Sequence, residues 1–81
     1  MSPKTPRNIS GQNLIKLLQK FGYEISRQKG SHIRLTHSTD QGSHHITIPD
    51  YNPLKLGTLS AIVNEVAEHL QISKDSFLSK L

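Results

Sequence analysis

The order of hydrophobic periods along the chain limits the fold more than any other feature. Apolar residues at helical spacing come first, three short runs that alternate apolar and polar residues follow, and a second helical stripe comes after them. Helical stripes repeat at i, i+3, i+4 and i+7, whereas half-buried strands alternate with a period of two. We therefore predict an α+β fold: one three-stranded antiparallel sheet with helices on one face. With 81 residues, we expect a flexible arm at 1–8 and a single domain over 9–81.

Capping signals place the helices. Ser10 is a typical N-cap, which predicts a first helix over Gly11–Phe21. A second helix is expected to start near Gly57 or Thr58, and a short C-terminal helix is expected after the cap residue Ser73. The predicted order is helix, three strands, helix and short helix.

The alternation also assigns side chains to the two faces of the sheet, because a register slip of one residue would reverse every side chain. A three-residue turn, Lys29–Ser31, is expected between the first two strands. The predicted core face carries Tyr23, Ile25, Ile33, Leu35, Ile46 and Ile48. The predicted polar face carries Glu24, Ser26, Gln28, His32, Arg34, Thr36, His45 and Thr47.

Charge is distributed unevenly along the chain. The formal net charge is +4 with a pI of about 9.7; residues 1–37 carry seven Lys and Arg against one acidic residue, whereas residues 38–81 carry three against five. A basic half favours a polyanion partner, and a solvated basic surface explains the charge equally well.

Several classes of protein are excluded or disfavoured. The absence of cysteine excludes disulfide frameworks, thiolate zinc sites and cysteine nucleophiles. The chain start has no apolar segment typical of a signal peptide, and no apolar run reaches the roughly 18 residues of a membrane span. We therefore expect a soluble cytoplasmic protein with no membrane association.

Four histidines crowd the second and third strands, so a metal site has to be considered. His37 and His44 are expected to lie opposite each other, while His32 and His45 lie on the other face and apart along the strands. No three of the four converge in this register, and no carboxylate is spaced to join them. We predict neither a metal site nor a small-molecule cofactor.

His32 is a candidate catalytic residue because it follows a basic turn that contains Gly30. Turn amides and nearby cations can hold a phosphate, and an imidazole with a pKa near its usual value of about 6.5 can move protons at neutral pH. These groups are the minimum for cleavage of RNA by attack of its 2′-hydroxyl. On the residues alone, the favoured interpretation is plainer: an exposed histidine that fills space at the start of a strand.

A family resemblance changes that balance. The run Arg27–His32 resembles the signature of HicA toxins, the small mRNA interferases of HicA–HicB toxin–antitoxin pairs. Further features occur in the matching order, and the resemblance covers about residues 9–80. These features are the helix from Ser10 to Gly22, the strand end Ile48–Pro49, the helix start Gly57–Leu59 and the tail Ile72–Leu78.

The resemblance implies the fold of double-stranded-RNA-binding domains and a catalytic role for His32. It implies the toxin of a type II system: a metal-independent endoribonuclease that cleaves mRNA, inhibits translation and is held by a HicB-like antitoxin. We expect that antitoxin to cover the face that carries His32. The expected RNA and phosphate contacts are Arg27, Lys29, Gly30, Ser31 and Arg34.

The chain departs from the family pattern at two positions. Many HicA proteins have a second histidine directly after the first, where this chain has Ile33, and another after the strand-ending proline, where it has Tyr51. Tyr51 either stacks on RNA or packs at a connector, and it stands with His45 as an auxiliary candidate. Two other functions remain open: a non-catalytic RNA-binding module and a structural partner subunit without an RNA role.

Overall fold

The protein folds as a helix, a three-stranded antiparallel sheet, a second helix and a short third helix. The computed structural model describes residues 8–81, so the expected arm at 1–8 lies, except for its last residue, outside the described part. The elements are α1 (Gly11–Lys20), β1 (Glu24–Lys29), β2 (His32–Thr39), β3 (Gly42–Pro49), α2 (Leu56–Leu70) and α3 (Lys74–Leu78). The strands lie in the order β1-β2-β3. This confirms the predicted α+β class and its arrangement like that of double-stranded-RNA-binding domains.

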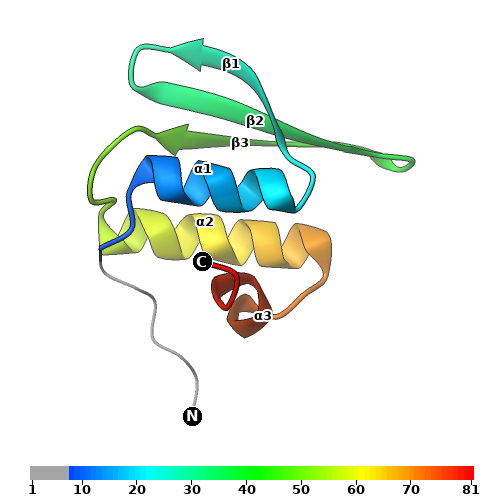
Figure 1. Cartoon of the computed structure of the whole chain (residues 1–81). Coiled ribbons are helices and arrows are strands. Elements are labelled where there is room, and N and C mark those ends of the chain that lie inside the picture. The colour runs from blue at the N-terminus through cyan, green and yellow to red at the C-terminus, as the bar shows by residue number, and fades with distance from the viewer. Residues whose placement is uncertain (1–7) are drawn as a thin grey trace.

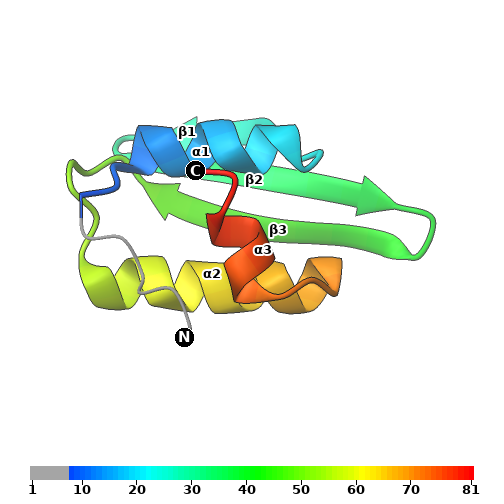
Figure 2. The same ribbon diagram turned by 60° about the horizontal axis from the view of Figure 1, so that its bottom comes forward.

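Two layers make up the molecule. The helices α1 and α2 lie side by side on one face of the sheet, and α3 lies outside them (Figures 1 and 2). The opposite face of the sheet is left without a helix. The core therefore lies between the sheet and α1 and α2, and α3 adds the fully buried Phe77 to it.

Side-chain caps explain where α1 and α3 begin. At the start of α1, Ser10 Oγ accepts from the backbone N–H of Asn13 at 3.0 Å, while Asn13 Oδ1 accepts from the backbone N–H of Ser10 at 3.3 Å. This reciprocal capping box satisfies two N–H groups that would lack partners inside the helix. Ser73 caps α3 through the backbone N–H of Ser76 at 3.0 Å. Both predicted N-caps are confirmed.

Helix ends differ slightly from the predictions. The helix α1 ends at Lys20, one residue early, and Gly22 follows with a φ of +99° that glycine tolerates without strain. The helix α2 starts at Leu56, before the predicted Gly57 or Thr58, and its N-cap Lys55 makes no side-chain cap bond. Within residues 8–81, no helix combines the length and the apolar character that crossing a membrane requires.

A β-bulge in β1 changes the predicted faces. The register shifts between Ile25 and Arg27, so that Arg27 pairs with Arg34 and Gln28 pairs with Ile33. Because paired residues share a face, the predicted position of Gln28 on the polar face is wrong.

The predicted burial of Ile25 is also wrong. Ile25 pairs with the fully buried Leu35, but it is 50% exposed. All six residues of β1 are exposed, because β1 is an edge strand that the helices leave uncovered. The other predicted core positions of the sheet are buried.

The first turn is shorter than predicted. Lys29 pairs with His32, which leaves a two-residue turn of Gly30 and Ser31, and Gly30 has a φ of +58°. Turns of this length favour positive φ at the first position, where glycine fits best. Lys29 is therefore part of the ladder, directly beside His32.

Candidate nucleic-acid interface

The uncovered sheet face carries a row of basic groups that starts at His32. His32 is exposed at the first position of β2, between Lys29 on β1 and Pro49 on β3. Two positions further along β2, Arg34 lies opposite Arg27. Like charges directly opposite each other destabilise a sheet. Within residues 8–81 the one ion pair involves none of these groups, so their charge is available to an anion.

The turn beside His32 gives a ligand room to approach. A Cβ at Gly30 would meet no heavy atom within 4 Å, so the turn projects into solvent. The backbone N–H of Asp50 donates to the Ser31 carbonyl at 2.7 Å and holds the connector after β3 against this turn. Ser31 and Gly30 therefore lie on a fixed, accessible turn next to His32.

Tyr51 lies at the same end of the sheet. Its carbonyl accepts from the backbone N–H of Gly11 at 2.8 Å, whereas the residue is 49% exposed and does not belong to the core. Its backbone is fixed by this contact, and its ring is available to solvent or to a ligand.

His45 lies on the same face as His32 but apart from it. It pairs with Thr36, four residues beyond His32 on β2, which corresponds to a separation of about 13 Å along the strand. The predicted separation of the two histidines along the strands is confirmed, and at this distance His45 cannot act on the same phosphate as His32.

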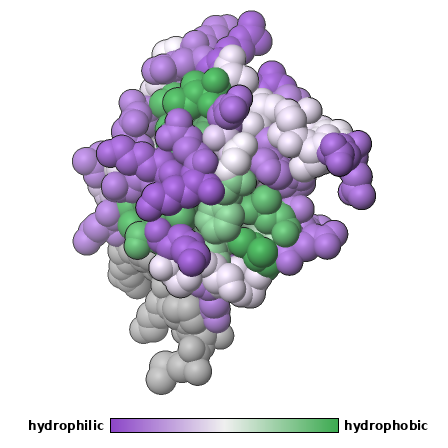
Figure 3. Space-filling model, turned by 45° about the vertical axis from the view of Figure 1, so that its right-hand side comes forward, coloured by the Kyte–Doolittle hydropathy of each residue, from purple (hydrophilic) through white to green (hydrophobic). Residues whose placement is uncertain are grey.

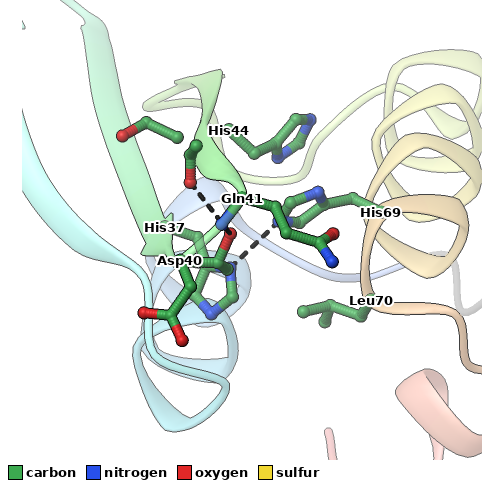
Figure 4. Close-up of a pocket in the computed structure, with 9 residues that line it drawn as sticks. His37, Asp40, Gln41, His44, His69 and Leu70 are labelled. Atoms are coloured by element: carbon green, nitrogen blue, oxygen red, sulfur yellow. Dashed lines mark hydrogen bonds between the residues drawn. The ribbon is translucent and has the colours of Figure 1, made fainter.

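A cluster of three histidines lies on the helix side of the sheet, at the end away from His32. His37 Nδ1 and His69 Nε2 share a hydrogen bond of 3.0 Å, and the rings of His44 and His69 stack with centroids 4.2 Å apart. The close-up in Figure 4 shows His37 and His44 on the β strands facing His69 on α2. Sequence analysis placed His37 opposite His44 correctly but missed His69. Its position three residues after the buried Val66 was the signal that it faces the sheet.

Burial and charged neighbours shift the pKa of two residues at this cluster, Tyr23 and His69. His44 lies between Tyr23, whose hydroxyl is 2.7 Å from its Nδ1, and Glu65, 3.1 Å from its Nε2. Burial and, second, the charge of Glu65 raise the pKa of Tyr23 to about 12. Burial, followed by the charges of His44 and His37, lowers the pKa of His69. The neutral form of His69 is therefore favoured, and its contacts with His37 and His44 join α2 to the β2–β3 hairpin.

An open hollow of about 640 Å³ adjoins the cluster. It is bounded by the histidines, the β2–β3 loop and Leu70. Figure 3 shows the molecule from the side of this loop, where hydrophilic residues surround small apolar areas. Within residues 8–81, no group of three or more His, Asp or Glu is placed to hold a metal ion. The hollow lies at the other end of the sheet from His32, Lys29 and the arginine pair.

The fold and this site define a class: a small α+β domain, arranged like double-stranded-RNA-binding domains, that leaves a basic sheet face uncovered. The profile described as the HicA toxin of bacterial toxin-antitoxin matches residues 11–72. The chain belongs to this HicA family and is thus the toxin of a toxin–antitoxin system. Comparisons with curated proteins and with solved structures gave no match.

Proposed function

We propose that the protein is an mRNA interferase: a metal-independent endoribonuclease, hence a hydrolase of phosphodiester bonds, that cleaves mRNA in the cytoplasm and inhibits translation. The observation that carries the proposal is the position of His32. It is exposed, pairs with Lys29 and lies two residues from the arginine pair on a face without a helix. A proton-transfer group and positive charge at one place are what phosphodiester cleavage requires.

The proposed chemistry needs only this chain, its RNA and water. The 2′-oxygen attacks the adjacent phosphorus while the bond from phosphorus to the 5′-oxygen breaks, which leaves a 2′,3′-cyclic phosphate and a 5′-hydroxyl. Water then opens the cyclic phosphate, which makes the net reaction a hydrolysis. His32 takes the proton of the 2′-hydroxyl or gives a proton to the leaving oxygen, and solvent carries the other proton. Lys29, with Arg27 or Arg34, neutralises charge on the phosphate as it builds up.

The turn and the neighbouring aromatic ring complete the proposed substrate site. Gly30 lets the RNA backbone approach closely, because a larger side chain would project from this turn and its positive φ suits glycine. Ser31 offers backbone and hydroxyl donors beside the phosphate. Tyr51 is half exposed at the same end, so its ring provides a stacking surface for a base.

A cleavage assay with matched variants tests the proposal. Purified protein and a labelled transcript are incubated, and His32→Ala is compared with wild type while circular dichroism reports the fold. Loss of a proton-transfer group is expected to lower the rate by about 10²–10⁴-fold. A folded His32→Ala protein that still cleaves at the wild-type rate contradicts the assignment.

His45→Ala is the comparison variant, since it removes a second exposed histidine from the same face. A comparable loss in His45→Ala, with His32→Ala active, would move the reaction along the sheet. Salt-dependent RNA binding without cleavage by wild type would support the non-catalytic RNA-binding module instead.

A further inference from the structure

A hydrogen-bonded chain crosses all three strands on the exposed sheet face. Ser26 Oγ lies 3.3 Å from the Arg34 carbonyl oxygen, Thr36 Oγ1 lies 2.9 Å from Ser26 Oγ, and His45 Nδ1 lies 2.8 Å from Thr36 Oγ1. Ser26 comes from the bulge in β1, Thr36 from β2 and His45 from β3. The bulge therefore places Ser26 at one end of this series of hydrogen bonds.

The number of hydroxyl protons available in this series of hydrogen bonds determines the tautomer of His45. The Arg34 carbonyl only accepts, so Ser26 uses its one proton there, and Thr36 uses its own proton on Ser26. Thr36 then has only lone pairs for His45, and His45 Nδ1 must carry the hydrogen of the 2.8 Å contact. In the neutral ring, Nε2 is left with a free lone pair.

We propose that His45 Nε2 accepts a hydrogen bond from a bound nucleotide, at a subsite along the RNA from the scissile phosphate. This inference rests on the proposed function, because it assigns a second contact to the same RNA. His45 is exposed and about 13 Å along the strand from His32, too far to act on the same phosphate. The shared chemistry is an N–H or O–H donor, which RNA supplies from an exocyclic base amino group or from its 2′-hydroxyl.

The charge between the two histidines supports one continuous binding track. Arg34 lies two residues from His32 and two residues from Thr36, which is the partner of His45, and Arg27 lies opposite Arg34. A phosphate on this arginine pair would place one nucleotide toward His32 and the next toward His45. Glu24 lies opposite Thr36 and ends the basic stretch.

The first test reads the tautomer without RNA. Long-range ¹H–¹⁵N NMR at a pH where the ring is neutral is expected to show a protonated Nδ1 and an unprotonated Nε2 for His45. Thr36→Val removes the acceptor and should shift His45 toward the other tautomer, whereas Thr47→Val on the same face should leave it unchanged. A wild-type His45 with its hydrogen on Nε2 overturns the inference.

The second test measures binding in a His32→Ala background, so that no substrate is cleaved. The probes are a short oligoadenylate, its deoxy counterpart, and a purine ribonucleotide oligomer that lacks the 6-amino group. Adding His45→Ala should weaken oligoadenylate binding about two- to tenfold, the effect of one hydrogen bond. A probe that lacks the donor should bind with the same affinity before and after His45→Ala. If the affinity of the deoxy oligomer is unchanged, the donor is the 2′-hydroxyl; if that of the purine oligomer is unchanged, the donor is the 6-amino group.

The outcomes separate this inference from the proposed function. If His45→Ala weakens the binding of all three probes equally, or of none of them, His45 accepts no hydrogen bond from a specific donor and the inference fails. If His45 reads a donor but wild type does not cleave RNA, the nuclease proposal fails and the subsite stands. If no probe binds but wild type cleaves a transcript, the subsite inference fails and the nuclease proposal stands.

Discussion

Arg27 and Arg34 lie directly opposite each other on the exposed face of the sheet, two cations on neighbouring strands. Placing like charges in a cross-strand pair costs stability, so a fold without an anionic ligand would gain by losing one of them. The β-bulge creates this pair, because uninterrupted alternation would have turned Gln28 to this face instead.

The first prediction concerns this arginine pair. Arg27→Ala should weaken RNA binding at all sequences and lower the slope of log affinity against log salt by about 1, since it removes one of the proposed phosphate contacts. Stability should be unchanged or slightly higher. Fluorescence anisotropy across a salt series measures the slope, and Lys74→Ala on the exposed part of α3 is the matched control. An unchanged slope would exclude Arg27 from the RNA contacts.

Features of the fold that depend on local chemistry could be read from the sequence. Ser10 and Ser73 cap their helices as predicted, because an N-cap needs only a side-chain oxygen near the following backbone N–H groups. The positions of His32 and His45 on the uncovered face also follow from alternation, and β2 and β3 contain no bulge.

Features that depend on tertiary context could not be read. Ile25 was predicted in the core because nothing in its neighbourhood shows that β1 is an uncovered edge with a shifted register. The hydrogen-bond partner of His45 could not be predicted either, since Ser26, Thr36 and His45 come from three strands and meet only through the bulge. The same extra residue decides that Arg27, and not Gln28, lies on the uncovered face of the sheet.

The second prediction concerns the buried hydroxyl of Tyr23. Tyr23→Phe keeps the ring in the core but removes the 2.7 Å hydrogen bond to His44, which should lower the free energy of unfolding by about 1 kcal/mol. Urea denaturation measures the change. Tyr51→Phe is the matched control: its side chain is half exposed, so the change should stay within about 0.5 kcal/mol. Equal effects of the two variants would contradict a stabilising Tyr23–His44 bond.

The third prediction is a loss of stability in mild acid through His69. The pKa of His69 is lowered in the folded protein by burial and then by His44 and His37, so below about pH 6.5 this residue binds a proton more readily in the unfolded chain than in the folded one. The stabilisation is present above that pH and is lost as pH falls toward the lowered pKa. Thermal melts between pH 8 and pH 5 should show a falling midpoint. His69→Gln should flatten the curve, and His32→Gln, outside the cluster, should not.

The fourth prediction concerns metal dependence. Cleavage should continue in excess EDTA and leave a 5′-hydroxyl on the downstream fragment, because the proposed mechanism uses only His32 and the basic groups beside it. A kinase that phosphorylates only free 5′-hydroxyls identifies the end. If EDTA abolished cleavage and one divalent ion restored it, the histidine cluster around His37 and His69 would become the place to look for a ligand set.

The last prediction concerns the antitoxin that membership of a toxin–antitoxin family implies. The uncovered sheet face is where a partner would compete most directly with RNA, since it carries His32 and the cations beside it. Carboxylates of a HicB-like partner would gain charge-assisted hydrogen bonds to Arg34 and exclude phosphate from the same place. Arg34→Glu and Lys29→Glu should therefore weaken the complex, mostly by faster dissociation for the partly buried Arg34 and by slower association for the exposed Lys29.

Pulldown and surface-binding kinetics with the product of the neighbouring gene measure both effects, and an RNA competition assay tests exclusion. The matched control is Glu68→Lys on the exposed side of α2, which reverses a charge away from the sheet. If the sheet variants bound the antitoxin as wild type does, or RNA and antitoxin bound together, inhibition would act from elsewhere. Loss of binding in Glu68→Lys would then identify α2 as the docking surface, because a basic partner face would pair with Glu65 and Glu68 there.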